Sequence, residues 1–322
     1  MSTIERALEK KRQLAENRRR LEQEQAAREA SLRGDNDPTL VSQETASQGM
    51  SNPQLTATLS AQIQASAKVQ VDTQQQAEEG KHTDPQVNID IKRLESMGMV
   101  SPTENFTKIK EEYRYIKRPL LNNAFGPGSS TLDQPNLVMV SSSFPGEGKT
   151  FTTINLAISM AMEEDRQVLL VDADVIKPSI CSRLGIDEQP GLMDYLTGKV
   201  EVADIIINTN IANLKLITAG RRHHHSNEMI ASEKMKRFME ELSERYPDRI
   251  VIFDTSPLLG ASETNVLAQM TGQAVIVIEE KKTSHAQLKQ ALSLLNPNMA
   301  IGLVLNKSQG KRVNYGYYYA NS

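Results

Sequence analysis

Cysteine and long apolar segments are scarce in this sequence, and each scarcity excludes a class of protein. Cys181 is the only cysteine, so no disulfide can form within the chain, and a reducing compartment is the simplest setting. No apolar run approaches the roughly 18 residues that a membrane-spanning helix needs. The N-terminal residues also lack the apolar centre of a signal peptide. We therefore expect a cytoplasmic protein.

The sequence also lacks an excess of either charge. It has 37 Lys and Arg against 40 Asp and Glu, which gives a formal net charge of −3. Proteins that bind nucleic acid through its phosphates usually concentrate positive charge. We expect no nucleic-acid partner.

Aromatic residues make up only 4% of the chain, and almost none lies in its first third. Residues 1–34 place a few apolar residues among many charged ones, at spacings typical of a helix with a narrow apolar stripe. This segment is either a docking helix for a partner or a solvated, partly formed helix. Residues 35–88 are rich in Gln, Ser and Pro, and we predict a flexible linker there.

Residues 89–312 have the composition of a folded domain, and 313–322 form a tyrosine-rich tail. Apolar segments alternate with helical patterns from about Leu137 onward, which is typical of an α/β domain with a mainly parallel sheet flanked by helices. Ahead of it, apolar residues recur at helical spacing over Lys108–Ala124, which predicts a helix.

The most informative segment is Val138–Thr150, where an apolar run breaks into Ser-Ser-Ser-Phe-Pro-Gly-Glu-Gly-Lys-Thr before a helical pattern. This order predicts a strand, a phosphate loop and a helix. The backbone N–H groups of such a loop and the positive end of the following helix attract nucleotide phosphates. Lys149 would add charge near the β and γ phosphates, and the Thr150 hydroxyl would ligate Mg²⁺. An ordinary glycine-rich turn is the alternative, since Ser143 stands where the usual motif begins with Gly.

Two further apolar runs end in carboxylates. Val168–Val171 is followed by Asp172 and Asp174, and Ile250–Phe253 is followed by Asp254. Ligands of an open α/β sheet bind at the carboxyl ends of its strands, so we expect these side chains to converge beside the phosphate loop. Carboxylates around a triphosphate require a cation, and Mg²⁺ is the usual one. Capping of the following helices is the alternative role.

Two more strands are predicted, over Ala274–Ile278 and Ile301–Leu305. The second is followed by Asn306, whose amide could hydrogen-bond an adenine edge. The expected nucleotide-binding residues are therefore Pro145, Gly146, Glu147, Gly148, Lys149, Thr150, Phe151 and Asn306.

Three of these segments together carry a family resemblance. Ser-Ser-Phe-Pro-Gly-Glu-Gly-Lys-Thr, Val-Leu-Leu-Val-Asp-Ala-Asp and Ile-Val-Ile-Phe-Asp-Thr-Ser-Pro resemble the Walker A, A′ and B motifs of bacterial protein-tyrosine kinases. The resemblance runs from about Ile89 to the C-terminus. It is strongest to the standalone kinases that accompany a chain-length-determinant membrane protein in exosortase-associated exopolysaccharide clusters. One departure is Ile176, where the family often has a basic residue.

The resemblance implies a reaction and its residues. It implies ATP and Mg²⁺ as cofactors, a P-loop fold, and phosphorylation of tyrosines in the chain's own tail. It assigns catalysis to Lys149, Asp172 and Asp174, metal contacts to Thr150, Asp172, Asp174 and Asp254, and phosphate acceptance to Tyr315, Tyr317, Tyr318 and Tyr319. Half of the eight tyrosines of the chain lie in this tail, and a flexible terminus can reach another active site.

The resemblance also implies partners. Glu111, Arg114 and Lys117 resemble the family's Glu-x-x-Arg-x-x-Arg oligomerisation helix, with Lys117 in place of the last Arg. A homo-oligomeric ring, a membrane chain-length-determinant protein whose cytoplasmic tail activates the kinase, and a tyrosine phosphatase follow from the resemblance. They would place the protein at the cytoplasmic face of the inner membrane. A solvated helix face is the alternative for the stripe itself.

Two other functions stay open from the residues. A positioning ATPase of the deviant Walker type needs an extra Lys five residues before Lys149, and this chain has Phe144 there. A nucleotide-gated scaffold would recruit partners through the N-terminal arm without forming phosphotyrosine. We expect His223, His224 and His225 to form a solvated loop rather than a metal site, and Cys181 to contribute packing rather than a nucleophile.

Overall fold

The computed structural model describes residues 86–309, except 104, 246 and 247. The chain divides into a unit of residues 1–81 and a unit of residues 82–322, and the described residues all belong to the second. The predicted helix of residues 1–34, most of the predicted linker and the tyrosine tail lie outside the described residues.

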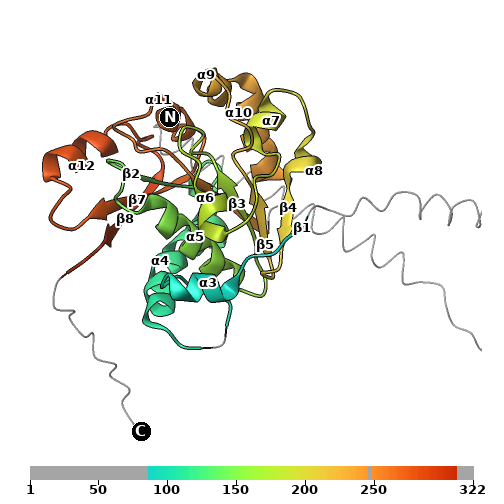
Figure 1. The fold of residues 1–322 in the computed structure, drawn as a ribbon. Helices are drawn as coiled ribbons and strands as arrows, with labels where there is room; N and C mark the ends of the chain where they lie inside the picture. Colours follow the sequence, from blue (N-terminus) through green and yellow to red (C-terminus); the bar gives the residue numbers. More distant parts are fainter. Residues whose placement is uncertain (1–85, 104, 246–247, 310–322) are drawn as a thin grey trace, which may run out of the picture. The chain divides into compact units, whose positions relative to one another are not determined.

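An eight-stranded sheet forms the centre of the domain (Figure 1), with the strand order β1-β4-β5-β3-β6-β2-β7-β8. Neighbouring strands are parallel except β4 and β5, which are antiparallel. The predicted α/β fold with a mainly parallel sheet is confirmed. The strands are β1 Gln86–Val87, β2 Leu137–Ser142, β3 Gln167–Asp172, β4 Ile207–Thr209, β5 Leu214–Ile217, β6 Arg249–Asp254, β7 Gln273–Glu279 and β8 Ala300–Asn306.

Helices cover both faces of the sheet (Figure 1). Alternate residues of β3 and β6 enter two different apolar clusters, because successive side chains of a strand point to opposite faces. One cluster contains buried residues of α4 and α5, and the other contains residues of α7 and α10. The helices are α3 Ile91–Ser96, α4 Lys108–Phe125, α5 Lys149–Ala161, α6 Ile180–Leu184, α7 Leu192–Leu196, α8 Val202–Ile205, α9 Ser226–Ile230, α10 Glu233–Glu244, α11 Ser262–Leu267 and α12 His285–Leu292, with a 3₁₀ turn at Ser129–Thr131.

The three strands β1, β4 and β5, at one side of the sheet, were not predicted from the sequence. Gln86–Val87 pairs with β4, although residues 35–88 were predicted as linker, so the ordered pairing begins three residues before the predicted domain start at residue 89. A strand of two residues has no alternation to detect, and β4 has only three residues. Both are stabilised by tertiary pairing rather than by a local pattern.

No helix among the described residues is both long and apolar enough to cross a membrane.

Candidate active site

The phosphate loop, residues 143–150, joins the carboxyl end of β2 to the first turn of α5. Gly146 and Gly148 have φ angles of 87° and 103°, a conformation that side chains disfavour. A Cβ atom at Gly148 would lie 2.0 Å from Asn306 Nδ2. The second glycine is therefore required both for its backbone conformation and for the close approach of β8.

Residues at the end of β8 and in the segment after β7 form hydrogen bonds with the phosphate loop. Asn306 Nδ2 donates to the Glu147 carbonyl at 2.8 Å, and Lys307 Nζ donates to the Gly146 carbonyl at 2.6 Å. The buried Glu147 carboxylate accepts from the Phe144 N–H at 2.8 Å and from the Thr283 hydroxyl. These contacts fix the carbonyl side of the loop, and therefore preorganise its shape before any ligand arrives.

Asn306 also supports the phosphate loop. Its Nδ2 binds the loop and its Oδ1 accepts from the Lys307 N–H at 2.8 Å. The contact of this amide with an adenine edge stays a prediction. The sequence missed Lys307 and Thr283 as loop contacts because both act from strands distant in the chain.

Lys149 lies among the expected carboxylates. Its Nζ is 2.5 Å from Asp174 Oδ2 and 3.9 Å from Asp254 Oδ2, and the residue is only 9% exposed. Buried charges require a partner or hydrogen bonds. The ammonium group therefore supplies the counter-charge of this cluster.

Asp254 is fully buried at the end of β6 and binds the first turn of α5. Its two oxygens accept from the Thr150 hydroxyl at 2.7 Å and from the Thr153 hydroxyl at 2.9 Å. Burial raises the pKa of Asp254, and the nearby Lys149 ammonium opposes that rise. Asp254 thus orients the hydroxyl expected to meet a metal ion. The sequence did not identify Thr153, one helical turn beyond the motif.

Asp172 occupies the end of β3, directly opposite Asp254 in the register of the sheet. It accepts from the backbone N–H groups of Ser179 and Ile180, each at 3.1 Å. Burial, followed by the charge of Asp254, raises its pKa to about 7. Asp174 accepts from the Ser256 hydroxyl at 2.7 Å. A serine of the Walker B-like segment thus positions an aspartate of the Walker A′-like segment.

The residues present fit a nucleotide with Mg²⁺. The buried Ser143 hydroxyl has no hydrogen-bond partner among the described residues, and it lies in the loop that would receive phosphates. No three His, Cys, Asp or Glu side chains of the described residues form a ready-made metal site. Mg²⁺ at a nucleotide usually takes one or two protein oxygens beside phosphate and water ligands, and the Thr150 hydroxyl, held by Asp254, is such an oxygen at the phosphate loop.

The Asp254→Asn variant should need more Mg²⁺ for activity while its ATP affinity changes little. Asparagine weakens the negative charge that orients Thr150, but the loop N–H groups still bind the phosphates. We expect the half-saturating Mg²⁺ concentration to rise about tenfold, the scale of a lost second-sphere contact to a metal. The matched control is Asp165→Asn, an exposed carboxylate of the turn after α5. An unchanged Mg²⁺ titration would place Asp254 outside the metal site.

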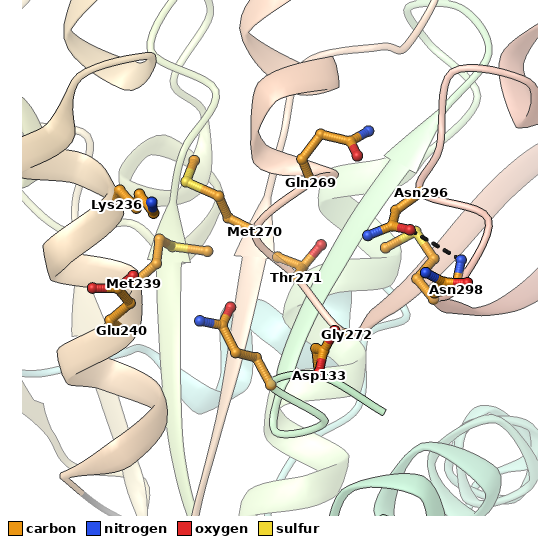
Figure 2. A pocket seen from close by; sticks show the side chains of 12 residues that line it. Asp133, Lys236, Met239, Glu240, Gln269, Met270, Thr271, Gly272, Asn296 and Asn298 are labelled. Carbon is orange, nitrogen blue, oxygen red and sulfur yellow. Dashed lines mark hydrogen bonds between the residues drawn. The ribbon is translucent and has the colours of Figure 1, made fainter. Parts of the chain in front are cut away.

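One cavity lies at the carboxyl ends of the strands and another at their amino ends. One, of about 290 Å³, lies beside Asp172 and is lined by α6 and by the residues after β5. The other, of about 340 Å³, is shown in Figure 2, with Lys236, Met239 and Glu240 of α10 on one side and Asn296 and Asn298 on the other. That second cavity also contains Gly272, which precedes β7, so it lies at the amino ends of the strands, away from the phosphate loop.

The structure corrects one member of the predicted oligomerisation stripe. Lys117 is buried, and its Nζ contacts the Ser159 carbonyl at 2.6 Å and Glu163 at 2.5 Å. It thus satisfies the carboxyl end of α5 within its own subunit, where a cation is favourable. Glu111 and Arg114 pair with each other at 2.6 Å, and the Arg114 side chain is exposed. The sequence spacing of Glu111, Arg114 and Lys117 does not show which side of the helix packs inward. In the structure, α4 packs on α5 with the Lys117 side.

Two of the remaining candidates lie in segments that follow the carboxyl ends of β3 and β5. The loop after β5 contains His223, His224 and His225, and His225 Nδ1 is 4.0 Å from Glu228. Cys181 is half-buried in α6, and burial with the charges of Asp172 and Glu188 raises its pKa to about 11. A thiol of raised pKa is a poor nucleophile at neutral pH. The four tail tyrosines lie outside the described residues.

Comparison with known proteins identifies the family. Residues 136–300 match the AAA domain family. The tyrosine-protein kinase YwqD of Bacillus subtilis (strain 168) is 30% identical over 223 residues, which cover 68% of this chain and 90% of that protein. The chain belongs to the bacterial tyrosine-protein kinases. The tyrosine-protein kinase ptk of Acinetobacter johnsonii is also 30% identical, but this kinase spans only 24% of its length.

Solved structures show the same fold. The VpsO kinase domain matches with a TM-score of 0.51 and 28% identity, over 62% of this kinase and 98% of that domain. The chimerical protein CapA2B2 matches with a TM-score of 0.55 and 24% identity, over 67% of this kinase and 98% of that chain. The motifs that predicted the family therefore lie on the fold that the family has.

Proposed function

We propose that this kinase transfers the γ-phosphoryl group of MgATP to the tyrosines of its own C-terminal segment. The observation that carries the proposal is the cluster of Lys149, Asp174, Asp254 and Asp172 beside a preorganised phosphate loop, in a chain that ends in four clustered tyrosines. The tail lies outside the described residues, and the relatives are named as tyrosine-protein kinases.

Positioning and charge neutralisation account for most of the catalysis of phosphoryl transfer. The phenolic oxygen forms a bond to the γ phosphorus as the bond to the β–γ bridging oxygen breaks, and ADP leaves with that electron pair. Lys149 exchanges its contact with Asp174 for the phosphates, where it stabilises the charge that develops on the bridge. When bound, Mg²⁺ would neutralise phosphate charge, and the Thr150 hydroxyl, held by Asp254, would contact it.

Asp172 and Asp174 have separate roles in the proposed transfer. Asp172 aligns the tyrosine hydroxyl and takes its proton, which then passes to solvent. The release of Asp174 by Lys149 would leave a carboxylate free to orient water beside a bound metal ion. A tyrosine hydroxyl has a reference pKa near 10, so the base need only align it and accept the proton late in the transfer.

A positioning ATPase is the competing function, and product stoichiometry separates the two. The kinase forms one phosphotyrosine for each ADP until the tail is filled, whereas an ATPase forms ADP with phosphate in solution. We therefore propose to follow ADP and phosphotyrosine in the same reaction of the dephosphorylated protein. A ratio near one supports the kinase, and ADP accumulation without phosphotyrosine contradicts it. The exposed Phe144, at the position where such ATPases need Lys, favours the kinase.

We further propose that the tail is phosphorylated between subunits of a ring, in association with the cytoplasmic tail of a membrane chain-length-determinant protein. This would place the kinase at the inner membrane and regulate the length and export of an exopolysaccharide, with a tyrosine phosphatase to reset it. The exposed Arg114 on α4, at a position of the predicted oligomerisation stripe, supports this assembly.

The Arg114→Glu variant should lower both the oligomer mass and autophosphorylation. The charge reversal breaks the ion pair with Glu111 and places two negative charges on the helix face that is expected to contact a neighbouring subunit. We expect light scattering to show mainly monomers and the phosphorylation rate to fall about tenfold, in line with one partly buried charge contact between subunits. The matched control is Arg237→Glu, an exposed arginine on a different helix, α10. Unchanged mass and activity in Arg114→Glu would leave the stripe as a solvated face.

A further inference from the structure

Among residues 86–309, β8 is the strand at one edge of the sheet (Figure 1). It pairs with β7 over all seven of its residues in an unbroken register, and its other side has no strand partner in this part of the chain. Natural proteins protect such an edge with a short strand, a bulge, a proline or a charged residue. The opposite edge is protected by the length of β1, which is two residues. The sequence of β8, Ala-Ile-Gly-Leu-Val-Leu-Asn, contains none of these devices.

One face of β8 is apolar and exposed. Ile301, Leu303 and Leu305 alternate along the strand and are 43%, 51% and 56% exposed. On the same face, Ile276 of β7 is buried in a cluster with Ala291 of α12. This face of the sheet is therefore covered over β7 and open over β8. A row of exposed apolar residues along an unprotected edge is typical of a surface that another protein element covers.

The other face of β8 borders a cavity of about 310 Å³ between the strand and α4. Its lining is mostly apolar and includes Tyr115 and Pro119 from the helix and Gly302 and Val304 from the strand. Tyr115 is 65% exposed. The edge thus has accessible apolar surface on both faces of the sheet.

The size of this edge fits a folded partner. A seven-residue strand is about 24 Å long, and a sheet with a helix layer on each face is about 30 Å thick. The edge along β8 therefore measures on the order of 700 Å², close to the roughly 800 Å² that each partner buries in a standard interface. A peptide strand alone would leave the helix layers uncovered, whereas a domain that has its own helix layers would cover them.

The strand is complementary to a second copy of itself. Leu303 is the middle residue of Ala300–Asn306. In an antiparallel pair centred there, Leu303 lies opposite its own counterpart, and Ile301 lies opposite Leu305. Directly opposite residues of antiparallel strands point to the same face, so the exposed apolar residues of the two copies would form one continuous row. No charged residue within β8 opposes this pairing.

We propose that β8 is an interface at which two copies of the kinase pair antiparallel, so that their sheets join around a two-fold axis beside Leu303. The interface is closed, because each copy uses the same strand. It is separate from the contact proposed for Arg114, and it does not depend on the proposed function. The Arg114→Glu protein, which should be monomeric when dilute, should therefore form dimers as its concentration is raised.

Sedimentation equilibrium of the Arg114→Glu protein tests the association. We expect a monomer–dimer equilibrium whose dissociation constant rises about tenfold with Leu303→Lys, because apolar contact is lost and two ammonium groups meet at the axis. The matched control is Met97→Lys, at an apolar residue that is 40% exposed at the end of α3, and it should leave the constant unchanged. An equal dissociation constant for Leu303→Lys in a folded protein would overturn the inference.

Cross-linking tests the register in the full chain. With Cys181→Ser, one introduced cysteine is the only thiol. Leu303→Cys should form disulfide-linked dimers, because opposite residues lie within disulfide reach. Ile301→Cys alone should not, since its counterpart would lie about 14 Å away, but its mixture with Leu305→Cys should cross-link. Equal cross-linking of Leu303→Cys, Ile301→Cys and Met97→Cys would indicate random collision and overturn the inference.

Residues 310–322 are the competing occupant, because they follow β8 directly in the chain. Their removal distinguishes the two. If copies pair through β8, the cross-linking yield of Leu303→Cys should stay the same in the shortened chain. A protein that cross-links only after residues 310–322 are removed would assign the edge to that segment and overturn the inference, as would the absence of cross-linking in both chains.

Discussion

Replacing Lys149 by Met should abolish phosphotyrosine formation. The ammonium group of Lys149 lies 2.5 Å from Asp174 and 3.9 Å from Asp254, and the proposed transfer needs it to stabilise the charge that develops on the bridging oxygen. Loss of one preorganised electrostatic contact costs about 100-fold to 1000-fold in rate. We expect at least the upper end of this range, measured as the initial rate of phosphotyrosine formation from MgATP with dephosphorylated protein.

Lys149→Arg is the matched control for charge. It keeps a cation among the carboxylates but changes its geometry, because a guanidinium group is planar and wider than an ammonium group. We expect this variant to unfold at a temperature closer to that of the unmodified protein than Lys149→Met does, and yet to be nearly inactive. Retained phosphorylation in a folded Lys149→Met protein would show that the phosphate loop has been assigned wrongly.

Replacing Tyr315, Tyr317, Tyr318 and Tyr319 together by Phe should remove most of the phosphate that the protein accepts. Single replacements should leave most of it, because neighbouring tyrosines of a flexible terminus can enter the site in many registers. ATP binding should survive in the fourfold variant, since the phosphate loop is unchanged. The measurement is the phosphate content of the intact protein by mass spectrometry after incubation with MgATP.

Tyr115→Phe controls for exposure alone. Tyr115 is 65% exposed on α4, and its replacement should leave the phosphate content unchanged. If the fourfold variant still accepts as much phosphate as the unmodified protein, the tail is not the substrate.

Each phosphate adds about −1.5 to −2 charges at neutral pH, so the phosphorylated tail should also repel the site carboxylates and loosen the assembly.

The central strands were predictable because each is buried on both faces. Such strands read as continuous apolar runs, and the runs at Val168–Val171 and Ile250–Phe253 became β3 and β6. The polar residue after each run then had to lie at the carboxyl edge of the sheet. The sequence therefore predicted that Asp172 and Asp254 lie at one edge of the sheet, and the strand register places them directly opposite each other.

The less predictable contacts depend on which helix face packs inward and on which strands become neighbours. Lys117 occupies a position of the oligomerisation motif, but its side chain binds the end of α5 because α4 packs with that face inward. Asn306 supports the phosphate loop because β8 ends beside it. Neither arrangement leaves a local pattern, since both partners of each contact are more than 40 positions apart.

Phosphate mapping after a single incubation tests the central claim most directly. The protein is first treated with a tyrosine phosphatase, then incubated with MgATP, digested and analysed by peptide mass spectrometry beside the Lys149→Met variant. Tyrosine autophosphorylation predicts phosphate on the peptides that contain Tyr315, Tyr317, Tyr318 and Tyr319, and none in the variant. ATP consumption with no phosphate on these tyrosines would contradict it.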